Sequence, residues 1–360
     1  MALDYHTTTP IAATVWGRSR RRVWLPIVAL GVLAIAILSI GVGSVAIPPL
    51  TALKVLAARL PFVAIVADWP ASSASILLDI RLPRVALVAL TGAALASSGA
   101  AYQGVFRNPL ADPYLIGVAS GAGLGAICVI VLRMRYPGLV GVFGIPLGAF
   151  AGALGTVALV YAFGRVGRSM PTTTLLLAGV ALGTLASALT TFVLLRAGQQ
   201  LGLISAFLLG SYGSAGWEPV LVIAPLVVLG FGALLLMARP LNLLLFDEEQ
   251  AQLLGIHVER AKLIVVVAAT LTTAASVAFS GPIGFAGLIV PHAARMLAGA
   301  DHRRLLPLSA LGGAGFLMLA DLLARTLIAP EELPLGVVTA LAGVPFFLYL
   351  LRRAKNAAFF

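Results

Sequence analysis

The stretch RPLNLLLFDEEQAQLLGIHVERAK, from Arg239 to Lys262, is the one long polar interruption in the apolar second half of this chain. It carries an acidic run at residues 247–249 and a glycine, Gly255, between two pieces of mixed polarity. This pattern predicts two short helices separated by a glycine C-cap. A solvated loop would not need its apolar residues, which therefore predict a protein partner: Leu244, Leu245, Ala251, Leu253, Leu254 and Ile256.

The composition on either side of this stretch is that of a membrane protein. Of the 360 residues, 60% are hydrophobic and 10% are charged, and the mean hydropathy is +1.05. These values predict an all-α polytopic membrane protein. The net charge of +11 comes from basic clusters between apolar runs, as the positive-inside rule requires, so nucleic-acid binding is not indicated. Cys128 is the single cysteine, which excludes a disulfide within one chain.

Apolar runs predict about ten transmembrane helices within a transmembrane domain at residues 23–352, with cytoplasmic tails at 1–22 and 353–360. In this assignment sixteen of the 24 Lys and Arg residues are cytoplasmic, which places both termini inside. The loop 47–83 is expected outside, with Leu53, Leu56 and Leu60 on an amphipathic turn. The expected spans are residues 23–47, 84–106, 114–132, 139–163, 172–195, 220–238, 263–279, 283–297, 305–327 and 334–351.

Glycines recur at intervals of four in two of the predicted spans. This spacing predicts close helix packing rather than nucleotide binding, because GAGLG at residues 121–125 lies inside an apolar span. The glycines concerned are Gly117, Gly121, Gly125, Gly144, Gly148 and Gly152.

Ionisable residues are scarce in the predicted spans. Asp321 and Arg325 stand four apart and are expected to pair on one helical face. His292 is interpreted as a hydrogen-bonded structural residue. No motif for a catalytic or metal site occurs, so neither an enzyme nor a metal-binding protein is indicated.

Six motifs occur in one order along residues 80–351. They are RLPR (81–84), RNPLADPYLIGVASGAGLGA (107–126), LLLAGVALG (175–183), GFAGLIVPHAAR (284–295), DHRRLLP (301–307) and ELPLGVVTALAGVPFF (332–347). With these motifs the chain resembles the FecCD-type permease subunits of ATP-driven importers for vitamin B12, haem and ferric siderophores.

The resemblance implies a type II ABC importer permease in the cytoplasmic (inner) membrane of a prokaryote. It implies a homodimer with the path at the subunit interface, two ATPase subunits that hold ATP and Mg, and an extracytoplasmic substrate-binding protein. No cofactor is expected on this subunit. Substrate choice among iron-siderophore, haem and cobalamin stays open.

The same resemblance assigns residues to three sites. Asp247 to Ile256 would be the first coupling helix, with His257 to Lys262 leading through a second; the ATPase-coupling residues are Asp247, Glu248, Glu249, Ala251, Gln252, Leu253, Leu254, Gly255 and Ile256. Thr172 and Thr173, with Ser120, would form a cytoplasmic gate, although Thr172 could instead cap its helix. Arg81, Arg84 and Arg325 would dock the binding protein, with helix-end snorkelling as the alternative for the first two.

An ion-coupled secondary transporter is the alternative from another class. Such proteins place ionisable residues or broken helices at mid-membrane, whereas His292, Arg295 and Asp321 are all expected near span ends. ATP dependence of uptake distinguishes the two.

Overall fold

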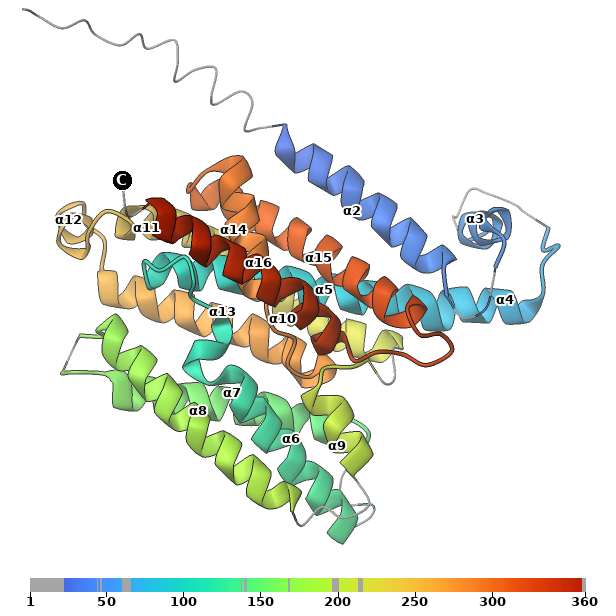
Figure 1. Ribbon diagram of the computed structural model, residues 1–360, viewed down its shortest axis with the longest axis horizontal. Coiled ribbons are helices and arrows are strands. Elements are labelled where there is room, and N and C mark those ends of the chain that lie inside the picture. Colours follow the sequence, from blue (N-terminus) through green and yellow to red (C-terminus); the bar gives the residue numbers. More distant parts are fainter. Residues whose placement is uncertain are drawn as a thin grey trace, which may run out of the picture.

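The computed structural model describes residues 23–357 except 44, 46, 60–65, 137, 139–140, 168, 196–200 and 213–215. Helices dominate these residues, which form no strand beyond one isolated bridge between Val166 and Ser169 (Figure 1). The all-α prediction is confirmed. The predicted tail 1–22 and residues 358–360 of the predicted C-terminal tail lie outside the described residues.

Apolar helices follow one another in the predicted order. Among the described residues, eight are long and apolar enough to cross a membrane: α2 (Trp24–Gly41), a continuous helix Ala71–Val105 made of α4 (Ala71–Ser75), η1 (Ile76–Arg81) and α5 (Leu82–Val105), α6 (Val118–Arg135), α7 (Gly144–Gly164), α8 (Thr172–Leu194), α10 (Trp217–Leu236), α13 (Val258–Ser280) and α15 (His302–Thr326). Two apolar helices are shorter, α14 (Ala286–Ala298) and the stretch Leu335–Tyr349 of α16 (Leu335–Ala357). Together they account for the ten predicted spans.

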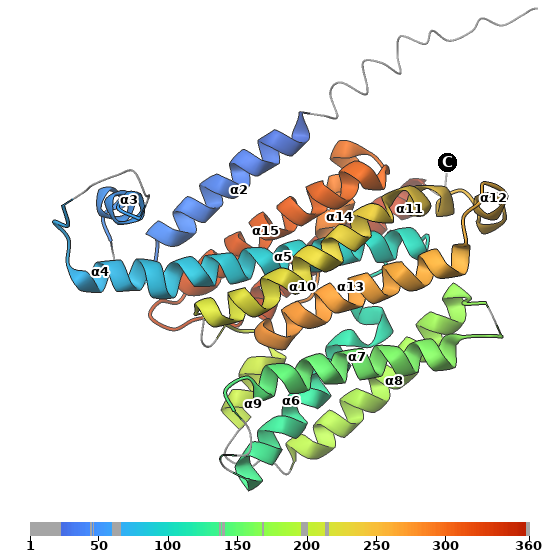
Figure 2. The same ribbon diagram turned by 180° about the vertical axis from the view of Figure 1, so that it is seen from behind.

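Five short helices lie between the spans, and some of them mark the two ends of the bundle. They are α3 (Pro49–Ala57), η2 (Pro113–Ile116), α9 (Leu201–Leu208), α11 (Ala238–Leu244) and α12 (Glu248–Leu253). We call the end that carries α11 and α12 the α12 end, and the opposite end, with α3 and α4, the α4 end (Figures 1 and 2).

Helix α5 lies at the centre of the bundle. In its most apolar window 78% of the residues are buried, against 6% in α2 and 17% in α8, and α5 packs against α10, α13, α14 and α15. A Cβ built on Gly92 would lie 2.1 Å from the carbonyl oxygen of Gly313 in α15, and one on Gly99 would lie 1.9 Å from that of Gly287 in α14. Glycine therefore lets these backbones touch.

The predicted glycine packing also joins α6 to α7. A Cβ on Gly125 would lie 2.0 Å from the carbonyl oxygen of Gly148, and one on Gly121 would lie 2.5 Å from that of Gly152. The two helices interlock through small residues, which confirms the packing interpretation.

The second span begins earlier than predicted. Its helix starts at Ala71 and not at Arg84, because Asp79 and Arg81 break the apolar pattern without ending the helix. Arg81 is 6% exposed and donates hydrogen bonds to the carbonyl oxygens of Ile40 (3.0 Å) and Gly41 (2.9 Å). A buried charge with such partners is compatible with the helix interior.

The predicted loop 47–83 is consequently shorter than expected. Helix α3 forms where Leu53 and Leu56 predicted an amphipathic turn, and Leu60 lies outside the described residues.

Candidate functional site

The predicted coupling segment 239–262 forms the tip of the α12 end (Figure 1). Asp247 is the N-cap of α12, and its carboxylate accepts a hydrogen bond from the backbone N–H of Glu248 at 2.6 Å. Gly255 follows the helix with φ +82°, in the left-handed region that favours glycine. The predicted helix and glycine turn are both present.

The segment after Gly255 differs from the prediction. His257 is the N-cap of α13, and residues 258–262 are the first turns of this 23-residue helix and not a separate second short helix. The helix continues because Val258 and Lys262 face inward, where both residues are 2% exposed. The mixed charge of residues 259–262 predicted a short polar helix, but the fold buries Lys262.

Apolar side chains of the segment divide into a buried set and an exposed set. Leu244, Ala251 and Val258 form a small buried cluster that holds α12 against the bundle. The exposed set includes Leu245 (37% exposed), and we call its three most exposed members the apolar tip: Phe246 (76%), Leu253 (88%) and Leu254 (66%). Large apolar side chains grouped at such exposures are typical of a surface that binds another protein.

Glu248 joins α12 to two other elements. One carboxylate oxygen lies 2.7 Å from Lys262 Nζ at the start of α13, and the other lies 3.1 Å from Arg107 Nη2 in the turn after α5. Arg107 also lies 3.5 Å from Asp247. These ion pairs fix the position of α12 relative to α5 and α13.

The predicted gate residues Thr172 and Thr173 begin α8, also at the α12 end. Pro171 is the N-cap and no side chain caps the helix, so the alternative that Thr172 is the cap is wrong. Thr174 instead donates hydrogen bonds to the carbonyl oxygens of Gly164 (2.7 Å) and Pro171 (3.0 Å), which joins the end of α7 to the start of α8. Thr173 is exposed.

Ser120 lies apart from the two threonines. Its hydroxyl donates to the carbonyl oxygen of Gly117 at 3.1 Å, and a Cβ built on Gly183 of α8 would lie 3.3 Å from it. Gly183 is eleven residues beyond Thr172, which corresponds to about 16 Å along an α-helix. The structure therefore does not bring Ser120 together with Thr172.

Arg84 and Arg325 meet on Asp321 at the α4 end. Arg84 donates to one oxygen of Asp321 from Nη2 (2.8 Å) and Nε (3.1 Å), and Arg325 Nε donates to the other at 2.9 Å. The predicted pairing of Asp321 with Arg325 is confirmed. Arg84 also donates from Nη1 (3.0 Å) and Nη2 (2.8 Å) to Glu332, whose side chain is 49% exposed.

Arg81 and Arg325 form hydrogen bonds to the C-terminal end of α2. Arg325 donates to the carbonyl oxygens of Ser39 (3.2 Å) and Val42 (3.3 Å), while Arg81 donates to those of Ile40, Gly41 and Val45. The last carbonyls of a helix have no partner within it, so the two guanidinium groups satisfy them. Arg81 and Arg325 are 6% and 8% exposed, and snorkelling into solvent does not describe Arg81.

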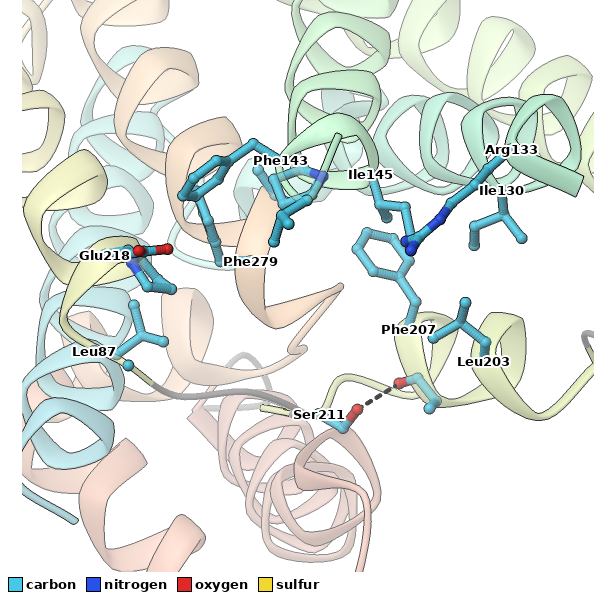
Figure 3. Close-up of a pocket in the computed structure, with 16 residues that line it drawn as sticks. Leu87, Ile130, Arg133, Phe143, Ile145, Leu203, Phe207, Ser211, Glu218 and Phe279 are labelled. Atoms are coloured by element: carbon cyan, nitrogen blue, oxygen red, sulfur yellow. Dashed lines mark hydrogen bonds between the residues drawn. The ribbon is translucent and has the colours of Figure 1, made fainter. Parts of the chain in front are cut away.

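A cavity of about 500 Å³ opens between α5, α6, α7, α9, α10 and α13. Its walls include Phe143, Phe207 and Phe279, with Arg133 and Glu218 on separate sides (Figure 3). The described residues contain no group of three or more His, Cys, Asp or Glu side chains that could hold a metal ion. Apolar walls with two separated charges suit an amphipathic molecule better than a metal ion.

Three of the residues in these contacts had no predicted ion pair. Arg107, Lys262 and Glu332 each pair with a charge on another element. One signal could have indicated the pairing of Arg107. The predicted topology places Arg107 and the acidic run 247–249 in loops on the same side of the membrane, where opposite charges can meet.

The family model described as the FecCD transport family matches residues 31–353. This chain belongs to the FecCD transport family. The hemin transport system permease protein HmuU of Yersinia pestis is 45% identical over 284 residues, 78% of this chain and 84% of that protein. The cobalamin import system permease protein BtuC of Halobacterium salinarum is 47% identical over 283 residues, 79% and 75% of the two chains.

Longer matches come from another relative and from a solved structure. The Fe(3+)-citrate import system permease protein YfmE of Bacillus subtilis is 36% identical over 338 residues, 93% of this chain and 97% of that one. An ABC transporter of metal-chelate type, solved in an inward-facing conformation, has a TM-score of 0.77 at 31% identity and covers 92% of this FecCD chain. The resemblance and the permease fold are confirmed, and the protein is a multi-pass ABC transporter permease.

Proposed function

We propose that this FecCD permease forms the membrane path of an importer for a metal chelate or tetrapyrrole, of the iron-siderophore, haem or cobalamin kind. The relatives named for hemin, cobalamin and Fe(3+)-citrate support this range. The cavity bounded by three phenylalanines, Arg133 and Glu218 has the amphipathic character that such cargo requires.

The apolar tip is the observation that carries the proposal. Phe246, Leu253 and Leu254 project from a segment that Glu248 and a buried apolar cluster hold in place. An ATPase subunit with an apolar cleft would bury this tip, and its movement would reach the spans through α12. ATP and Mg would reside on the ATPase, and this chain would contribute alternating access without chemistry of its own.

The remaining parts of the assembly follow from this arrangement. The α12 end would face the cytoplasm, with both chain termini, and Thr172 and Thr173 of two identical subunits would narrow the path there. The α4 end would receive the substrate-binding protein. Arg84, paired with the half-exposed Glu332, would make the contact, while Arg81 and Arg325 would hold the docking surface in shape.

Reconstitution in vesicles tests the proposal. Permease, ATPases and loaded binding protein are assembled so that ATP can be supplied on the α12 side, and labelled haem, cobalamin or ferric citrate is measured in the vesicle. We expect uptake only with ATP and ATPase present. Uptake by the permease alone, driven by a proton or sodium gradient, would establish a secondary transporter instead.

A further inference from the structure

Lys262 is a buried cation that lies between α12 and the start of α8. Its side chain is 3% exposed, although lysine is among the residues least often buried. Its Nζ lies 2.7 Å from Glu248 of α12 and donates to the carbonyl oxygen of Met170 at 3.4 Å. Met170 is itself 3% exposed and stands two residues before Thr172.

The preferred partner of Lys262 comes from another element. Glu259 stands three residues earlier on the same helix, yet it lies 3.8 Å from the ammonium, farther than Glu248. A lysine that only stabilised α13 would be served by Glu259. The shorter contact instead joins α13 to α12, the segment that bears the apolar tip.

The connection from Lys262 to α8 is short and stiff. Only Pro171 separates Met170 from Thr172, and the proline ring fixes φ, which is −64° here. A displacement of the Met170 carbonyl is therefore passed to the start of α8 more directly, because φ of Pro171 cannot rotate freely to absorb it. Lys262 is buried whereas the Glu248 side chain is 29% exposed, and a buried charge is costly to leave without its partner, so Glu248 and Lys262 are expected to move together.

We propose that Lys262 is a positioning residue that transmits movement of α12 to the gate at the start of α8. The chain of contacts is Glu248 to Lys262 to the Met170 carbonyl, and then through Pro171 to Thr172. This inference rests on the proposed function, because it takes α12 as the ATPase contact and Thr172 with Thr173 as the gate. It adds the group that couples them.

The test uses the full transporter with Cys128→Ser and Thr173→Cys, so that the only cysteines in the permease lie at the gate. Oxidation joins two such cysteines only when their Cα atoms approach within about 7 Å. Disulfide yield is compared with and without a non-hydrolysable ATP analogue. Uptake per ATP hydrolysed is measured in a permease that keeps Thr173. We expect at least a fivefold difference in disulfide yield between the two nucleotide conditions.

Lys262→Met should retain the ATPase within twofold in co-purification, because methionine suits the buried position. It should reduce the nucleotide-dependent difference in disulfide yield to less than twofold, and it should lower uptake per ATP at least tenfold. Lys262→Arg should keep more than half of the parental difference in disulfide yield and more than half of the parental uptake per ATP. Arg303→Met is the matched control, since it removes an exposed cation from the same end of the bundle and should change neither.

Each contrary result identifies what fails. If Lys262→Met keeps the parental disulfide response or the parental uptake per ATP, Lys262 transmits nothing. If it releases the ATPase, the lysine only supports the docking surface; the relay is wrong and the coupling site stands. If the parent forms no disulfide in either condition, the gate assignment fails and the relay to Thr172 fails with it, while ATP-dependent uptake by that parent still supports the importer.

Discussion

Replacing Leu254 with Asp should separate the permease from its ATPase. The Leu254 side chain is 66% exposed, and burying a whole leucine contributes about 1.5–3 kcal/mol, so enclosing the exposed part contributes about 1–2 kcal/mol. Burying a neutral polar group in an apolar cleft costs about 1–3 kcal/mol, and an ionised aspartate costs more. The sum is at least about 3 kcal/mol, which corresponds to at least about 100-fold weaker binding.

Binding is measured by titrating labelled ATPase onto permease in lipid nanodiscs. Leu50→Asp is the matched control, because Leu50 is also 66% exposed but lies on α3 at the opposite end of the bundle. Its Kd should stay within twofold of the parent. Size-exclusion profiles establish that both variants are folded and inserted. A folded Leu254→Asp permease that binds the ATPase within threefold of the parent would show that the apolar tip is not the contact.

Three further outcomes are expected. Glu332→Gln removes an anion from Arg84, so capture of the binding protein should accelerate severalfold at low salt and lose this gain at 1 M salt; a slower or unchanged rate at low salt contradicts the docking role. Burial raises the pKa of Asp112 to about 6 in the folded protein, above its unfolded value, so the folded state loses stability as the pH rises from about 4 to 6. Asp112→Asn should therefore raise the thermal midpoint at pH 7.5 but not below pH 4. An equal shift of the midpoint at both pH values refutes this. Gly99→Ala should lower the thermal midpoint, because the added Cβ would lie 1.9 Å from a backbone oxygen. Gly155→Ala should raise the midpoint slightly, because no atom of a neighbouring element lies within 4 Å of its added Cβ. Shifts of the same sign contradict the packing argument.

Local and periodic features of the fold were predictable from the sequence. Long apolar runs predict spans because the bilayer requires them, and glycines four apart predict the contact of Gly121 and Gly125 with α7. Asp321 and Arg325 are four apart on one helix, so their pairing needs no knowledge of the rest of the fold. The turn at Gly255 is equally local.

Long-range charge pairing was not predictable. Arg81 interrupts the apolar pattern, and its carbonyl partner at Ile40 lies 41 residues away, so the early start of the second span could not be recognised. Lys262 has partners 14 and 92 residues away. A charge in a sequence indicates exposure unless its partners are known, and only the fold brings these partners together.

The first membrane helix depends on residues made long after it. Its final carbonyls are served by Arg325, 286 residues later in the chain. At about 5–20 residues per second, the ribosome needs roughly 15–60 s to synthesise the intervening chain. Arg81 is made 41 residues after Ile40 and can serve the carbonyls of Ile40 and Gly41 early, whereas the donor to the carbonyl of Ser39 is made only with Arg325. The final seating of α2 is therefore a late step of biogenesis, and chains that stop before Arg325 leave the helix without that anchor.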